Sequence, residues 1–223
     1  MSERILFIVT SHAQLGNTNQ LTGLYLPELI HPFEIFNQMG YQIAVASPSG
    51  GNAPIDPKSL SDELAEYVSL TQGTIPLEQI DPNDYDVFFV VGGHGTVWDL
   101  PDNPELQRIL PAAYDRGKII AAVCHGPASL VNLKTEFGEY LLQGKQVTGF
   151  TNEEEAAVKL TSVVPFLLED ALKRAGGKYS GKPNWQVNVV VDERLITGQN
   201  PASASKVAEE IVKILSMQLA AVA

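Results

Sequence analysis

The residue best suited to carry chemistry is Cys124, the only cysteine among 223 residues, and His125 follows it directly. The apolar run before this pair is typical of a buried strand, and a helical pattern begins with Gly126 and Pro127. In a nucleophile elbow the reactive side chain occupies a sharp strand-to-helix turn, and the residues two before and two after it must be small. Ala122 and Gly126 meet that requirement. The pattern therefore predicts a nucleophilic cysteine, with an inert core cysteine as the alternative.

The same turn predicts the reactivity of the thiol. A sulfur at a helix N-terminus lies near unpaired backbone N–H groups and the positive end of the helix dipole, and both lower the pKa of a thiol. We therefore expect Cys124 to lie partly accessible at the floor of a pocket, with a thiol pKa below about 8.5. Such a thiol would exist in part as the nucleophilic thiolate at neutral pH.

A second predicted strand ends in a glycine-rich turn formed by Gly92, Gly93, His94 and Gly95. Glycines let backbone N–H groups approach an anion without obstruction by side chains. Beside the elbow, Gly92, Gly93 and His94 would therefore bind the substrate and stabilise an oxyanion. The spacing is not that of a GxGxxG dinucleotide loop, and no P-loop Lys-Ser/Thr pair follows. A simple tight turn is the alternative interpretation.

Short β-branched runs alternate with amphipathic helical patterns along the chain. This alternation predicts an α/β fold with a doubly wound, mainly parallel sheet and helices on both faces. The predicted strands cover residues 5–10, 42–47, 87–91, 118–123 and 146–148, and the predicted helices cover residues 27–39, 104–116, 126–133, 165–175 and 202–219.

Three further segments complete this picture. A hairpin-like pair at 187–191 and 195–197 would add to the sheet as its antiparallel part. Residues 50–82 and 133–145 are longer than ordinary connections, and the first contains a helical pattern at about 62–69. Because no repeat or linker divides the chain, we expect a single domain that spans the whole sequence, residues 1–223.

Composition narrows the possible functions. A net charge of −11 without a Lys/Arg cluster argues against nucleic-acid and membrane partners. No stretch approaches the roughly 18 consecutive apolar residues of a membrane span. The N-terminal segment lacks the features of a secretory signal, and a lone cysteine forms no internal disulfide. A cytoplasmic location is therefore expected. The four histidines lack HxH or HxxxH spacing, so no metal or other cofactor is expected.

Four stretches together resemble the ThiJ/PfpI superfamily, which has the class I glutamine amidotransferase-like fold. Within it they resemble the branch of heat-shock chaperones and glutathione-independent glyoxalase III enzymes. The stretches are residues 91–101, 122–128, 147–155 and 196–204. The resemblance implies a flavodoxin-like fold, a homodimer and a Cys-His-acid catalytic triad in one subunit. It implies that Cys124 is the nucleophile and His125 its partner, with Glu155 as the acid and Glu153 as the second choice.

Residues 27–32 match another element of this family, and the resemblance places Glu28 against the cysteine sulfur. A carboxyl held between an apolar helix and a thiol would have a raised pKa and could move protons near neutral pH. A capping charge at the start of a helix is the alternative for Glu28. His31 and Trp98 could also face the pocket, or lie at the surface.

The resemblance implies a cofactor-free lyase of the D-lactate dehydratase class that acts in methylglyoxal detoxification. Methylglyoxal and related 2-oxoaldehydes would become 2-hydroxy acids such as lactate through a hemithioacetal on Cys124. A stress-response holdase chaperone with unfolded-protein clients and a protein deglycase are the alternatives. A cysteine peptidase or amidase is less favoured, and the chain has Gln199-Asn200-Pro201 where a glutaminase places its distal histidine and acid.

Overall fold

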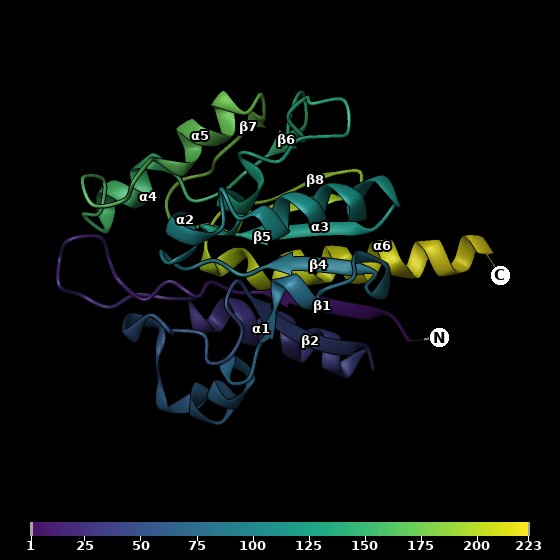
Figure 1. Cartoon of the computed structure of the whole chain (residues 1–223), viewed down its shortest axis with the longest axis horizontal. Helices are drawn as coiled ribbons and strands as arrows, with labels where there is room; N and C mark the ends of the chain where they lie inside the picture. The colour runs from purple at the N-terminus through teal and green to yellow at the C-terminus, as the bar shows by residue number, and fades with distance from the viewer. Residues whose placement is uncertain (1, 223) are drawn as a thin grey trace.

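The computed structural model describes residues 2–222, and its centre is a seven-stranded sheet (Figure 1). The strands lie in the order β3-β2-β1-β4-β5-β9-β8, and only β8 is antiparallel to its neighbour. Their bounds are β1 Arg4–Ile8, β2 Gln42–Ser47, β3 Ile75–Pro76, β4 Val87–Val90, β5 Ile119–Val123, β8 Val189–Asp192 and β9 Leu195–Gly198. The predicted mainly parallel, doubly wound sheet is confirmed.

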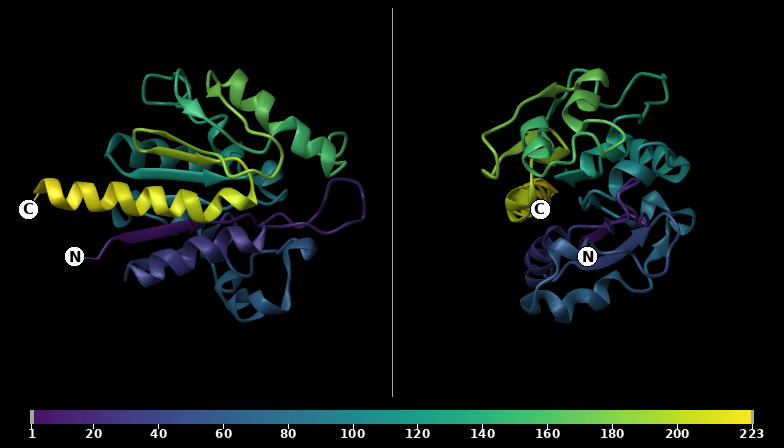
Figure 2. Two further views of the ribbon diagram at one scale, coloured as in Figure 1. Left: turned by 180° about the vertical axis from the view of Figure 1, so that it is seen from behind. Right: turned by 90° about the vertical axis from the view of Figure 1, so that its left-hand side faces the viewer.

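Helices cover both faces of this sheet, which is why β4 and β5 are buried along their whole length. Helices α1 and α6 lie side by side on one face, and α3 packs against β5 on the other (Figures 1 and 2). The helix bounds are α1 Leu26–Gln38, α2 Thr96–Asp99, α3 Pro104–Asp115, α4 Asn152–Ala157, α5 Leu168–Arg174 and α6 Ala204–Val222. Among residues 2–222, no helix combines the length and apolar character needed to cross a bilayer.

Three predicted elements are wrong in part. The segment after Cys124 is a 3₁₀ helix at Gly126–Leu130, and all its residues are buried, whereas an amphipathic α-helix would expose one face. The strand expected at 146–148 is β6 (Gln146–Val147), which pairs with β7 (Lys178–Tyr179) in a separate two-stranded sheet, because β9 occupies the place beside β5. In the expected hairpin only β8 is antiparallel, since β9 runs parallel to β5.

The two long connections also gain detail from the structure. Residues 50–82 hold β3 and consecutive 3₁₀ turns, including Asp62–Thr71 where a helical pattern was expected. The helix expected from residue 165 begins at residue 168, and it ends before Gly176 as predicted. Helix α2 was not predicted, since it spans only about one turn.

The site forms where the chain changes direction across the sheet. The strand order reverses between β1 and β4, and ligands of open α/β sheets bind at the carboxyl ends of strands near such a reversal. The chain leaves β4 into the Gly92 turn and leaves β5 at Cys124. Because β4 and β5 are parallel neighbours, these two turns lie side by side.

Candidate active site

Cys124 occupies the predicted sharp turn directly after β5. Its φ is +58°, in the left-handed region that a residue with a Cβ adopts only where surrounding contacts enforce it. Its N–H donates to the carbonyl of Gly198 at 3.0 Å, and its carbonyl accepts from the N–H of Phe150 at 2.9 Å. A Cβ added at Gly126 would lie 2.5 Å from the carbonyl oxygen of Val90. Gly126 is therefore required for the close approach of the turn to β4.

His125 and Glu155 extend from this thiol as a hydrogen-bonded chain. The Sγ atom of Cys124 lies 3.4 Å from His125 Nδ1, and His125 Nε2 lies 2.8 Å from Glu155 Oε2. Glu155 comes from α4, whose start is fixed by a capping box between Thr151 and Glu154. Of the two acids expected beside His125, the structure brings Glu155 there and leaves Glu153 exposed.

The protonation states follow from burial and hydrogen bonding. Burial, and then the nearby His94, lower the pKa of His125 to about 4, although Glu155 opposes this shift. Burial alone would raise the pKa of Glu155, but hydrogen bonds from His125 and His94 lower it to about 2. An ionised carboxylate only accepts hydrogen bonds, so the Nε2 atoms of both histidines must carry the protons. The Nδ1 atom of His125 therefore presents a lone pair to the thiol.

Glu28 is buried against the same turn. Its Oε2 accepts the N–H of Gly92 at 2.9 Å, and its carboxyl interacts with the Cys124 thiol. Burial raises the pKa of Glu28 to about 8. A capping role is wrong for this residue, because α1 has no side-chain cap and the carboxyl points across to the β4 turn.

The expectation of a lowered thiol pKa is also wrong. Burial, followed by the charge of the neighbouring Glu28, raises the pKa of Cys124 well above its ordinary value. The backbone N–H of His125 acts in the opposite direction but is outweighed. The five-residue 3₁₀ helix after the turn replaces the longer helix whose dipole was expected to stabilise a thiolate.

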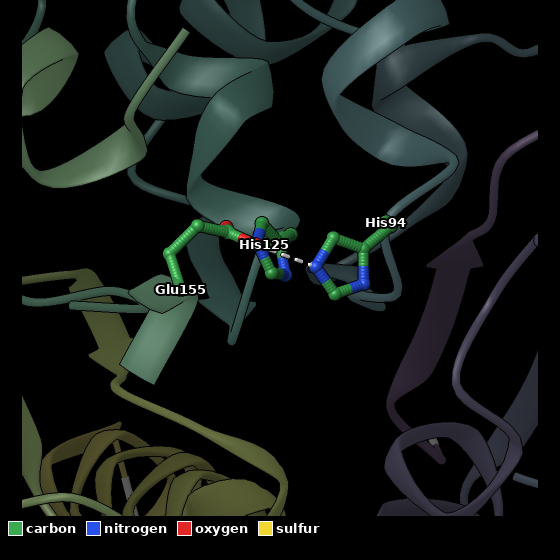
Figure 3. A group of neighbouring side chains, drawn as sticks. All are labelled: His94, His125 and Glu155. Atoms are coloured by element: carbon green, nitrogen blue, oxygen red, sulfur yellow. Dashed lines mark hydrogen bonds and ion pairs between the residues drawn. The ribbon is translucent and has the colours of Figure 1, made fainter. Parts of the chain in front are cut away.

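The glycine-rich turn has a different arrangement from the one expected. The N–H of Gly92 is already bonded to Glu28, so it holds that carboxyl and is not free for an oxyanion. Gly93 and His94 do line the cavity above the thiol. The ring of His94 lies 4.1 Å from that of His125, and its Nε2 meets Glu155 Oε1 at 3.0 Å (Figure 3).

A cavity of about 210 Å³ opens above Cys124, whose side chain is almost fully buried. Its walls are mainly aromatic and aliphatic, and they also include Asp56 and Lys58. The lining residues are Tyr25, Asp56, Lys58, Gly93, His94, Cys124, His125, Phe150, Val158, Leu160, Trp185 and Pro201. This volume suits a ligand of a few heavy atoms, since pockets for drug-sized ligands begin at about 300 Å³.

Of the two alternatives left open for His31 and Trp98, a place in the pocket is not the one observed, since neither residue lines the cavity above Cys124. Trp98 stacks on His12, with ring centroids 5.1 Å apart, and His31 is exposed on α1. The tryptophan that lines the cavity is Trp185, which has a φ of +65° and packs beside Phe150. The Pro-Asn pair before Trp185 indicates a turn, but no local pattern places that turn over the thiol.

Glu154 is a further residue that the sequence did not single out. Its buried Oε1 accepts three hydrogen bonds, from the N–H of Trp185 at 2.9 Å and from the side-chain amides of Gln199 and Asn200 at 3.1 and 2.8 Å. Its Oε2 accepts the N–H of Thr151 at 3.1 Å. The carboxylate therefore joins the Trp185 loop to the helix that carries Glu155.

Comparison with known proteins agrees with this arrangement. The model of the DJ-1/PfpI family matches residues 22–214. The chain belongs to the DJ-1/PfpI family. The resemblance noted in the sequence is therefore confirmed, and so is the flavodoxin-like fold that it implies.

Three comparisons show which proteins of this family the chain is similar to. "Glyoxalase 3" of Candida albicans is 33% identical, with 94% of this chain and 97% of that protein covered. A crystal structure of glyoxalase III from Candida albicans has a TM-score of 0.88 at 32% identity, covering 95% of this chain and 96% of the other. The X-ray structure of the 24 kDa Rapid Encystment Protein of Francisella tularensis has a TM-score of 0.90 at 40% identity, covering 94% and 97%.

Proposed function

We propose that this protein is a glutathione-independent glyoxalase that converts methylglyoxal and related 2-oxoaldehydes to 2-hydroxy acids such as lactate. The observation that carries the proposal is the buried thiol held between a neutral imidazole and a carboxyl of raised pKa, beneath a small and largely apolar cavity. Relatives that are named glyoxalases match this chain over nearly their whole length, and they support the same reaction.

The first step is addition of the thiol to the aldehyde. Cys124 Sγ bonds to C1 of the substrate, and the thiol proton passes through His125 Nδ1 to the carbonyl oxygen, which gives a neutral hemithioacetal. Glu155 orients the ring and stabilises the transient imidazolium. Gly93 lines the cavity, and its N–H serves as a donor to the developing oxyanion, a contribution on the order of a few kcal/mol.

The second step moves hydrogen within the substrate. Glu28, as the carboxylate, takes the proton from C1, and protonation of the C2 oxygen gives an enediol. Glu28 then returns that proton to C2, and the C1 hydroxyl loses its own proton, which balances the proton taken up by the C2 oxygen, so a 2-hydroxy thioester forms. A carboxyl whose pKa is about 8 suits this exchange, because it gains and loses a proton near neutral pH. His125 is the alternative carrier of this proton.

Hydrolysis completes the cycle. Water attacks the thioester carbonyl, the C–S bond breaks, and the thiol regains a proton while the 2-hydroxy acid leaves. C1 is oxidised and C2 is reduced, so the reaction consumes one water and requires no external oxidant.

The test is lactate formation from methylglyoxal in buffer that contains a chelator and no glutathione. Wild-type protein should turn over, and Cys124→Ala should be inactive although folded. Glu153→Gln is a matched control, since it changes an exposed carboxylate on the same helix as Glu155. A folded wild-type protein without lactate formation would contradict the proposal.

The remaining expectations about partners belong to the same proposal. We propose a symmetric homodimer, with residues 50–82 long enough to supply contacts.

A holdase surface should survive loss of one thiol, so Cys124→Ala separates the chaperone alternative from the enzyme. A peptidase is disfavoured by the volume of the cavity, which leaves no room for an extended peptide over Cys124.

A further inference from the structure

Two histidines of the site converge on one carboxylate. His94 Nε2 meets Glu155 Oε1 at 3.0 Å, and His125 Nε2 meets Glu155 Oε2 at 2.8 Å (Figure 3). The His94 side chain is 15% exposed, and those of His125 and Glu155 are nearly inaccessible. The triad itself requires only one histidine on this carboxylate, so the second imidazole is not accounted for by the proposed reaction.

The three side chains have the composition of a zinc site. Zinc commonly binds two histidines and one glutamate and keeps a fourth position open for water. Ligand atoms about 2.1 Å from a tetrahedral metal lie roughly 3.4 Å from one another. One donor atom from each of His94, His125 and Glu155 can be chosen so that all three lie within 4.8 Å of one another. The two histidine nitrogens now lie 3.0 and 2.8 Å from different oxygens of Glu155, so the side chains would have to separate by about half an ångström to admit the ion.

The surroundings allow a metal ion to enter. His94 and His125 both line the cavity, so an ion can reach them and retain a water ligand on the open side. The sulfur of Cys124 faces Nδ1 of His125, on the other side of the ring from the nitrogen that meets Glu155. Cys124 is therefore not among the ligands, which separates this site from simple binding of a metal to the thiol.

We propose that His94 Nε2, His125 Nε2 and a Glu155 carboxylate oxygen bind Zn²⁺, and that the bound ion reversibly inhibits the enzyme. An imidazole that binds zinc through Nε2 keeps its remaining proton on Nδ1. The ring of His125 then donates toward Cys124 and can no longer accept the thiol proton. This inhibition rests on the proposed function, whereas the binding of zinc does not.

Calorimetric titration of the chelator-treated protein with ZnCl₂ tests the binding directly. Wild-type protein should bind one equivalent, and His94→Ala and Glu155→Gln should each weaken binding at least tenfold. Cys124→Ala should bind zinc as the wild type does. His31→Ala is the matched control, because it removes an exposed histidine of α1.

Cobalt reports the ligands without reference to activity. Co²⁺ should give the visible bands of a four- or five-coordinate site without the intense near-ultraviolet band of thiolate ligation. Zinc should abolish lactate formation, and a chelator should restore it. Circular dichroism checks folding, and His94→Gln replaces His94→Ala if the latter does not fold.

Three outcomes would overturn the inference. They are zinc affinity unchanged in the folded His94 and Glu155 variants, zinc affinity lost in Cys124→Ala, or zinc bound at one equivalent without loss of turnover. A protein that binds zinc as described but forms no lactate even with a chelator would instead refute the proposed function, so the two failures are distinguishable.

Discussion

Replacement of Glu28 by glutamine separates the structural and chemical roles of this carboxyl. The glutamine would keep the shape of the side chain, and its amide oxygen would still accept the N–H of Gly92. The amide has no acidic proton, so it neither ionises nor accepts a proton from C1 of the substrate. The substitution therefore changes only the proton chemistry beside Cys124.

The effect on stability follows from the pKa of about 8. Between pH 4.5 and 8 the folded protein keeps the Glu28 proton and the unfolded chain loses it, so the free energy of unfolding falls as pH rises through that window. Each pH unit there costs about 1.4 kcal/mol. At pH 7 Glu28→Gln should therefore be more stable than the wild type by about 3 kcal/mol, and near pH 4.5 the two should be equal. A capping charge predicts the opposite sign, a loss of about 0.3–1 kcal/mol.

The same substitution should lower turnover although it raises stability. Loss of the proton carrier should lower kcat for methylglyoxal by about 10²–10⁴, while hemithioacetal formation at Cys124 persists. Urea unfolding at pH 5, 7 and 8.5 and lactate formation at pH 7 measure the two effects on the same preparations. Glu153→Gln is the control, because its exposed carboxylate should leave both quantities unchanged.

Two results would refute this reasoning. Near wild-type turnover by folded Glu28→Gln protein would remove Glu28 as the proton carrier and leave that role to His125. Wild-type and variant proteins with the same pH dependence of unfolding would show that the carboxyl does not hold its proton in the folded state.

Three other predictions concern neighbouring features. Iodoacetamide labelling of Cys124 should have a midpoint above the ordinary value of about 8.5 and shift downward in Glu28→Gln, and a wild-type midpoint at or below that value would contradict the raised thiol pKa. Glu154→Gln should lower the free energy of unfolding by about 1–3 kcal/mol, because an amide N–H would face the N–H of Thr151. It should also raise KM more than it lowers kcat, because the Trp185 loop would loosen. Unchanged unfolding and kinetics would refute this role of Glu154. Light scattering at micromolar concentration should show a dimer, and a clean monomer would defeat that expectation.

Local patterns were enough to predict the sheet and the elbow. Apolar runs such as Val87–Val90 are long enough to identify buried strands, and Gly126 beside Cys124 indicates a turn that tolerates no side chain. The same reasoning failed at residues 126–133, because a fully buried 3₁₀ helix has the hydrophobic content of a helix but exposes no polar face. It also failed at 146–148, since a short apolar run does not reveal which sheet it joins.

The part of the site that the sequence could not predict depends on contacts between residues far apart in the chain. His94 and Glu155 are 61 positions apart and meet only because β4 and α4 end at the same cavity. The three bonds from the Trp185 loop and its neighbours to Glu154 likewise join separate parts of the chain. Neither arrangement has a spacing that a sequence rule recognises, so neither was predicted from the residues alone.

The thiol of Cys124 shows why a local rule can give the wrong direction for a pKa shift in a folded site. A helix N-terminus lowers a thiol's pKa only if the sulfur is not also desolvated beside a carboxyl. At neutral pH Cys124 holds its proton and Glu28, with a pKa of about 8, is mostly protonated, while His125 is neutral with its free lone pair toward the sulfur. The thiol can therefore lose its proton to His125 as the aldehyde carbon approaches, without a standing thiolate. Alkylating agents need that thiolate, so they should react slowly with a protein that turns over methylglyoxal readily.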